Sequence, residues 1–230
     1  MYNHNIVPGP WFRRIINNFA PYGTTSQKNG GPGPALGFLT LARVVEFVRD
    51  PRGDISDIHI GYKALLNETA QARDNLTRMA KMRHLPSPPA ALPGGADIER
   101  IQLLCGAQFA VLLATTMLVN SLLRALMPGN ADLEDQTVGF PDELVALSRQ
   151  VSKYKPVGSG FIPTCLLMGC IAATDPTQVA KMTDAMTEYG LDPMQPRWQH
   201  WATEMNTQFQ DLRFNVALAH LENSVVPVQG

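Results

Sequence analysis

The segment that most constrains the fold is Ile101–Leu123, an uncharged run bounded by Arg100 and Arg124. As a helix it is long enough to cross a bilayer, for which about 20 apolar residues suffice. Amides and hydroxyls are nevertheless spread round this helix: Gln102, Gln108, Thr115, Thr116, Asn120 and Ser121. An isolated span would expose several of them to lipid, whereas a bundle can hydrogen-bond them. We therefore expect a buried bundle helix, with a membrane span at 101–123 as the alternative.

Apolar residues recur at helical spacing on both sides of this segment. Before it, we expect a helix from about residue 35 to Asp50-Pro51 and a long amphipathic helix from the N-cap Asp54 to near His84. After it, proline starts and proline or glycine stops indicate four shorter helices. These run from Pro141 to before Pro156, from Pro163 to Ile171, from Asp175-Pro176 to Gly190, and from about Arg197 to Leu221.

No segment shows sustained period-two alternation, so the sequence predicts an all-α fold, an irregular multi-helix bundle. Glycine and proline divide the chain into parts. We expect a flexible Gly/Pro-rich leader at 1–34, a helical domain at 35–222 with a loop at 85–96, and a tail at 223–230. A chain of 230 residues with 45% hydrophobic content can fill one substantial core.

Charge and cysteine usage exclude several classes of protein. The 19 Lys and Arg residues stand against 20 Asp and Glu residues, so a net charge of -1 creates no overall field that attracts nucleic acid. Cys105, Cys165 and Cys170 lie in apolar runs without CxxC spacing, which argues against a disulfide framework or a zinc module. Because Met1–Gly9 has no secretory signal, we expect a reducing compartment, the nucleus or the cytoplasm.

Motifs for nucleotide, hydrolase and metal chemistry are not found in the sequence. It contains no phosphate loop, GxSxG or HExxH pattern, so we assign no cofactor and no metal. Two charged groups are explained more simply by the ends of the long helix, whose first turn favours acids and whose last turn favours bases. The acidic group is Asp50, Asp54, Asp57 and His59, and the basic group is Arg73, Arg78, Lys81, Arg83 and His84.

The best candidate acid/base pair is His200 and Glu204, which are spaced i, i+4 on a predicted helix. Trp198 and Trp201 flank the histidine and would supply an aromatic pocket. The alternative is a surface helix whose tryptophans dock on the bundle, and we favour it because one such pair arises easily. An effector pocket, if the bundle interior forms one, would use Met168 together with Trp198 and Trp201 as ligand-binding residues.

Several short stretches resemble a known family. They are ALSR at 146–149, YKPVGS at 154–159 and FIPTCL at 161–166, followed by Asp175-Pro176. These resemble the C-terminal part of the regulatory domain of fungal zinc-cluster transcription factors. The step Pro196-Arg197-Trp198 and the stretch LARV at 41–44 are similar too, so the resemblance covers roughly residues 35 to 220.

The resemblance implies an all-helical regulatory domain from a family that often controls secondary-metabolite or catabolic gene clusters. That family binds DNA through six N-terminal cysteines that hold two zinc ions, and this chain has no cysteine before Cys105. We therefore expect a regulator-like protein without direct DNA binding, with a small-molecule effector, a protein partner or a second copy of the chain as its binding partner. The alternative is an enzyme of cyclase or isomerase type from a fungal biosynthetic pathway, with His200 and Glu204 as its acid/base groups.

Overall fold

The computed structural model describes Val44, Phe47 and residues 55–83, 98–155, 160–190, 200, 202–205, 207–212 and 214–216. Within these residues the regular structure is helical throughout, which confirms the predicted all-α bundle. The elements are α3 (Ile55–Arg83), α4 (Ile98–Leu126), α5 (Ala131–Asp135), α6 (Phe140–Val151), the 3-10 turn η1 (Ser152–Tyr154), α7 (Ile162–Ala172) and α8 (Pro176–Glu188). All described residues between 200 and 216 are helical as well.

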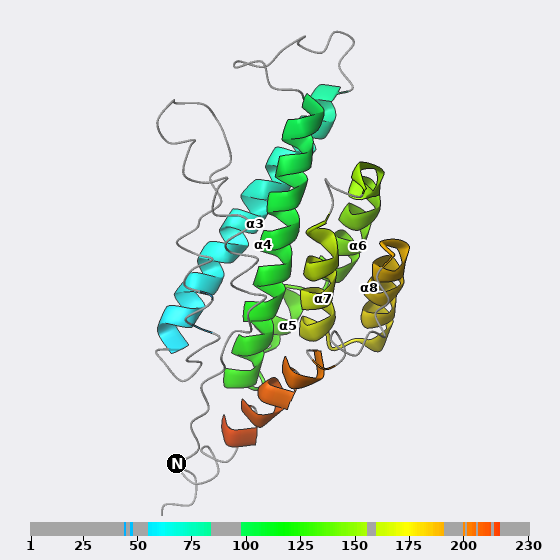
Figure 1. Cartoon of the computed structure of the whole chain (residues 1–230). Coiled ribbons are helices and arrows are strands. Elements are labelled where there is room, and N and C mark those ends of the chain that lie inside the picture. Colours follow the sequence, from blue (N-terminus) through cyan, green and yellow to red (C-terminus); the bar gives the residue numbers. More distant parts are fainter. Residues whose placement is uncertain are drawn as a thin grey trace, which may run out of the picture.

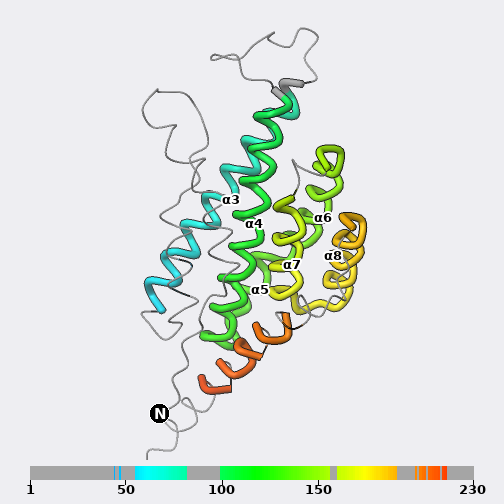
Figure 2. The backbone as a smooth tube through the Cα atoms, in the orientation of Figure 1, coloured from blue at the N-terminus to red at the C-terminus, as the bar shows by residue number. Residues whose placement is uncertain are grey.

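Helix α4 is the axis of the bundle. It runs antiparallel to α3 along most of its length, and α6, α7 and α8 lie on its other side (Figures 1 and 2). It contacts α3, α5, α6 and α7, whereas α8 packs on α6 and α7. Because α4 has neighbours on several faces, it buries apolar residues around most of its circumference, as its uncharged sequence predicts.

Local signals in the sequence account for most helix ends. Pro141 occupies the first turn of α6, and Asp142 and Glu143 lie at its positive end. The Asp175 carboxylate caps α8 by accepting a hydrogen bond from Thr177 N at 2.8 Å. After α8, Gly190 adopts a φ of 71°, a left-handed conformation that glycine tolerates best. The predicted boundaries of these helices agree with the structure to within a few residues.

The amides and hydroxyls of α4 are buried, as the bundle interpretation requires. All six polar side chains singled out in the sequence are at most 9% exposed. Thr116 Oγ1 lies 2.9 Å from Thr69 Oγ1 on α3, and Asn120 Nδ2 donates to Tyr62 Oη at 2.8 Å. Neighbouring elements therefore supply Thr116 and Asn120 with partners that lipid could not.

The membrane alternative concerns the same helix. Within the described part of the chain, the stretch Glu99–Leu126 is the one helix long and apolar enough to cross a membrane, and its most apolar 18-residue window has a mean hydropathy of 1.8. The bundle buries 78% of its most apolar window. The core helix of a soluble protein passes the same test of length and composition, so the membrane span stays an untested alternative.

Parts of the predicted organisation fall outside the described residues. These are the leader at 1–34, the loop at 85–96 and the tail at 223–230. Of the helix expected over 35–50, Val44 and Phe47 are described, and both are helical and buried. A Cβ on Gly61 would lie 2.5 Å from Phe47 Cε2, so glycine at this position of α3 lets the Phe47 ring pack against the helix.

Candidate functional site

The predicted acid/base pair lies on the protein surface. His200 and Glu204 are both helical, and both side chains are exposed. Trp198 and Trp201, which were expected to enclose the histidine, lie outside the described residues. The catalytic role of the pair therefore stays a prediction.

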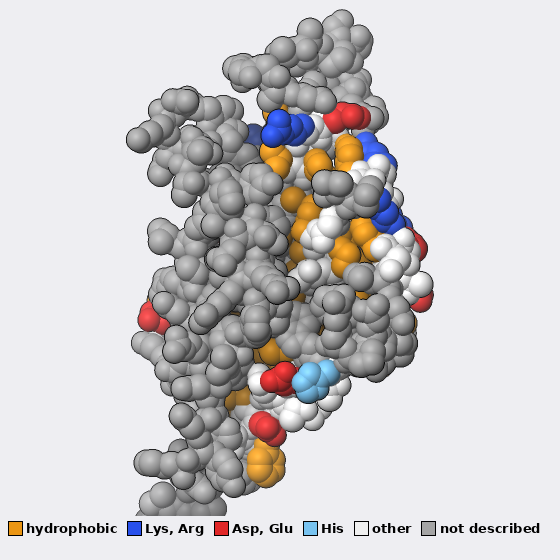
Figure 3. Space-filling model, in the orientation of Figure 1, with side chains coloured by type: hydrophobic (Ala, Val, Ile, Leu, Met, Phe, Trp, Pro, Cys, Tyr) orange, Lys and Arg blue, Asp and Glu red, His pale blue; other side chains and the backbone are white. Residues whose placement is uncertain are grey.

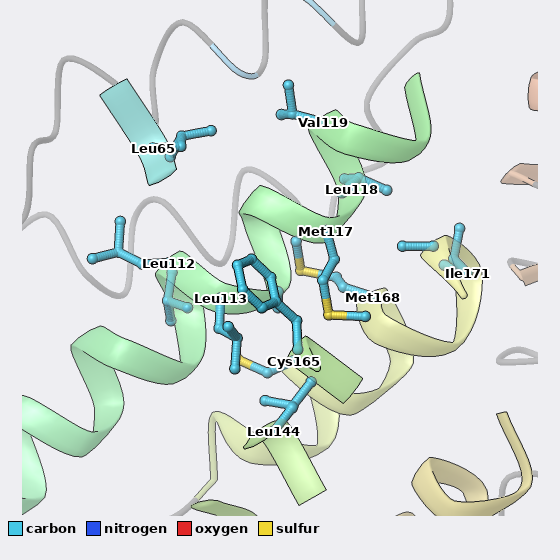
Figure 4. Packing of buried hydrophobic residues seen from close by; sticks show 14 of the residues in the cluster. Leu65, Leu112, Leu113, Met117, Leu118, Val119, Leu144, Cys165, Met168 and Ile171 are labelled. Atoms are coloured by element: carbon cyan, nitrogen blue, oxygen red, sulfur yellow. The ribbon is translucent and has the colours of Figure 1, made fainter. Parts of the chain in front are cut away.

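Met168 belongs to the packed core. It lies on α7, is 3% exposed, and shares a hydrophobic cluster with Met117 of α4 and Leu144 of α6 (Figure 4). A Cβ on the next residue, Gly169, would lie 2.6 Å from Met182 Sδ, so α7 and α8 pack closely here. Met117 also lines the cleft that is described below, whereas Met168 does not.

The cysteines are buried or partly buried thiols. Burial raises the pKa of Cys165 to about 12 and that of Cys170 to about 11, and it also raises the pKa of Cys105. All three side chains are therefore protonated at neutral pH and poorly nucleophilic. No group of three or more His, Cys, Asp or Glu side chains that could hold a metal ion is found among the described residues.

Arg73, one of the basic residues in the C-terminal half of α3, has a structural role. Arg73 forms a two-pronged ion pair with Glu143 of α6, through Nε at 3.0 Å and Nη2 at 3.2 Å. Its guanidinium also lies 5.7 Å from the ring centre of Phe109 and 5.8 Å from that of Phe140. Arg73 thus fastens α3 to α6 across α4.

A cleft of about 600 Å³ lies between the C-terminal half of α4, helix α5 with the turn after it, and the junction of α7 and α8. Volumes of roughly 300–1,000 Å³ are typical of small-molecule sites. Its apolar lining includes Met117, Pro141, Ala172 and Val138. We call it the α4–α5–α8 cleft.

Hydrogen bonds fasten each wall of the cleft. Arg124 Nη2 of α4 donates to the carbonyl of Ala172 at 2.9 Å, which ties α4 to the end of α7. Gln178 Nε2 of α8 donates to the carbonyl of Val138 at 3.1 Å, which ties α8 to the turn after α5. The cleft is therefore formed before any ligand arrives, which lowers the entropic cost of binding.

Ionisable groups border the cleft. Glu134 and Asp135 extend from α5, Arg124 from α4 and Asp175 from the start of α8. Hydrogen bonds from the Thr177 hydroxyl and amide, with a smaller contribution from the Lys181 charge, hold the pKa of Asp175 below its usual value. Its carboxylate therefore stays ionised at neutral pH.

A chain of hydrogen bonds leads from the cleft wall into the core. Thr137, which lines the cleft, donates through Oγ1 to Asn120 Oδ1 at 3.3 Å. Asn120 is fully buried and donates through Nδ2 to Tyr62 Oη and to the carbonyl of Leu133, at 2.8 and 2.7 Å. Burial raises the pKa of Tyr62 even though Asn120 and Arg124 act to lower it, so the phenol is neutral. We call this chain the Thr137–Asn120–Tyr62 network.

The other surface feature is apolar. On one face, hydrophobic side chains gather near the upper parts of α4 and α6, with Lys and Arg side chains along the edge (Figure 3). Leu104 of α4, at 41% exposed, is one of the large hydrophobic residues that α4 leaves partly uncovered. Asp and Glu side chains lie along the same edge, so charges of both signs border this surface too (Figure 3).

Sequence patterns could not predict the cleft, because its lining comes from segments that only the tertiary fold brings together. Its local signals are the turn at Gly129, whose φ is 88°, and the Asp175 cap. We take the cleft as the candidate functional site. No family model, no curated protein and no solved structure matches this chain.

Proposed function

We propose that this chain is a transcription-factor-like regulatory protein that responds to a small-molecule effector bound in the α4–α5–α8 cleft. Its helical domain would act as the regulatory domain of fungal zinc-cluster factors does, in the nucleus or cytoplasm, to control a fungal metabolic or secondary-metabolite gene cluster. DNA contact would come from a partner and not from the residues described. The resemblance of the sequence stretches at 146–166 gives the direction of this proposal.

The observation that carries the proposal is the link between the cleft and the core. Thr137 lines the cleft and also donates to the buried Asn120, which in turn holds Tyr62 of α3. A ligand that draws the Thr137 hydroxyl toward itself removes one hydrogen bond from Asn120. Leaving a buried polar group without a partner costs about 1–3 kcal/mol, which is the size of a typical allosteric coupling energy.

Helix α3 would therefore respond to occupancy of the cleft. Asn120 also holds α5 through the carbonyl of Leu133, so one side chain connects the cleft wall to both α3 and α5. A change at Asn120 would alter how these two elements pack on α4. The affinity of a partner that binds either element would then depend on whether the cleft is occupied, which is the behaviour required of a regulator.

The test uses two tryptophan substitutions in the encoding organism, compared with a strain that lacks the gene. Ala173→Trp fills the cleft, because Ala173 lines it. Ala180→Trp is the matched control, because Ala180 is an exposed residue of α8 outside the lining. Transcript profiles are measured in all strains under conditions that induce secondary metabolism.

The proposal expects the gene deletion to change transcripts of a contiguous gene cluster. It expects Ala173→Trp to lock that cluster in one state, either silent or constitutive, while Ala180→Trp responds as the wild type does. An unchanged transcript profile in the deletion strain would argue against a regulatory role. Equal behaviour of the two tryptophan variants would argue against the cleft as the effector site.

A further inference from the structure

We infer that the α4–α5–α8 cleft takes an organic amine, that is, a ligand with a cationic head group and an apolar body. This inference rests on the proposed function, because it names the chemical class of the effector that the same cleft would bind.

The charges around the cleft favour a cationic head group. Three carboxylates, those of Glu134, Asp135 and Asp175, line the cleft with one guanidinium, that of Arg124, and outside the lining the charge of Lys181 acts on Asp175. Asp175 is engaged in capping α8. Glu134 and Asp135 make no ion pair or side-chain hydrogen bond with any residue that the structure describes. An ammonium group would neutralise this charge, whereas an anionic ligand would add to it.

The apolar part of the lining favours a ligand with an organic body. Met117 and Ala172 are 4% and 3% exposed, so both form the buried side of the cleft, and Val138 at 60% exposed forms its rim. A volume of about 600 Å³ is far larger than a metal ion or an inorganic ion needs. Burial of a hydrocarbon body against these side chains would supply affinity, and the carboxylates would select a cationic head group.

The position of the charges relative to the apolar side fixes the orientation of the ligand. Glu134 and Asp135 belong to α5, and both are exposed at the outer edge. Met117 lies on α4 at the buried side. The ammonium group therefore lies toward α5 and solvent, while the body extends toward α4. This orientation keeps the charge hydrated and avoids the large cost of burying an isolated ion.

The experiment uses three probes that share one carbon body and differ in charge: 4-phenylbutylamine, 4-phenylbutanol and 4-phenylbutyrate. The full-length protein is labelled with ¹³C at the methionine methyl groups, and the Met117 signal is assigned with Met117→Leu. Each probe is titrated while the Met117 signal is followed by NMR. The variants are Glu134→Gln combined with Asp135→Asn, and Asp132→Asn as the matched control, because Asp132 lies on the same short helix outside the lining.

The inference predicts that the amine shifts the Met117 signal with a Kd at least tenfold lower than that of the alcohol, and that the carboxylate binds most weakly. The double variant should weaken amine binding about tenfold and leave alcohol binding unchanged, while Asp132→Asn leaves both unchanged. Equal or tighter binding of the carboxylate, retention of amine affinity in the double variant, or no Met117 shift with any probe would overturn the inference. The proposed function is decided separately by the transcripts of the Ala173→Trp strain, so the two failures are distinguishable.

Discussion

Replacement of Asn120 by leucine tests the role of the buried network at the centre of α4. Asn120 is 0% exposed, and its Nδ2 serves two acceptors, Tyr62 Oη and the carbonyl of Leu133. Leucine has a similar size but no polar atom, so it leaves both partners without Asn120 in an interior where Tyr62 and Leu133 are each 1% exposed. The variant thus isolates the hydrogen bonds from the packing.

The expected loss of stability follows from these two partners. Each buried polar group left unsatisfied costs about 1–3 kcal/mol, which gives about 2–6 kcal/mol for the pair. Burial of the additional apolar surface of leucine offsets about 1–2 kcal/mol of this. From the middle of these ranges, about 4 kcal/mol of cost and about 1.5 kcal/mol of offset, we expect Asn120→Leu to lower the free energy of unfolding by about 2–3 kcal/mol, measured by urea denaturation followed by circular dichroism.

A matched control is available on the same helix. Gln102 is 7% exposed, and its Oε1 has no hydrogen-bond partner within the described part of the chain. Gln102→Leu therefore removes an unsatisfied buried group and should leave stability unchanged or raise it by up to about 1 kcal/mol. The reasoning would be refuted if Asn120→Leu were as stable as the wild type, or if both variants lost equal stability.

Three further predictions concern packing, cysteine chemistry and pH. Gly169→Ala should lower the free energy of unfolding by about 1–3 kcal/mol, because the new Cβ would lie 2.6 Å from Met182 Sδ and 3.1 Å from Leu144 Cδ2. Gly106→Ala is the control in the same denaturation experiment. Its Cβ would lie 3.4 Å from Val151, so this variant should be as stable as the wild type or more stable. The three thiols should react with a chromogenic disulfide at pH 8 far more slowly in the folded protein than in urea. The half-buried Cys170 should react first and the fully buried Cys165 last. Fast reaction of all three thiols in the folded protein would contradict their burial. Folding lowers the pKa of Asp175 from 3.8, so the contribution of its carboxylate to stability is present above that pH and is lost as the pH falls through the lower, folded-state value. As the pH is lowered, the free energy of unfolding should therefore fall further for the wild type than for Asp175→Asn. Parallel curves of stability against pH would show that the cap contributes nothing.

Helix boundaries could be predicted from the sequence where one local signal decides them. Asp175-Pro176 and Gly190 delimit α8 within the chain itself, and the uncharged run at 101–123 identifies α4. Helix α5 was not predicted, because five residues are too few to show helical periodicity. Its position depends on tertiary contacts, among them the hydrogen bond from Asn120 to the carbonyl of Leu133.

Prediction of the site was limited by the same physics. The spacing of His200 and Glu204 places them on one helix face, but spacing carries no information about burial, and both side chains are exposed. The cleft depends on Arg124, Glu134 and Asp175, which are brought together only when α4, α5 and α8 pack. A sequence pattern within one segment cannot predict which other segments it contacts in the tertiary fold. The burial of the α4 amides was predictable, because their distribution round the helix requires partners on several sides.

The central claim is that α4 is the buried axis on which both the core and the cleft depend. Hydrogen exchange of backbone amides, followed by mass spectrometry on the full-length chain in buffer without detergent, tests it most directly. The amides of α4 between Phe109 and Leu123 should be the slowest to exchange of all the described segments, slower than those of α8, which lies at the edge of the bundle. Exchange in α4 as fast as in α8, or a chain that stays in solution only with detergent, would contradict the claim.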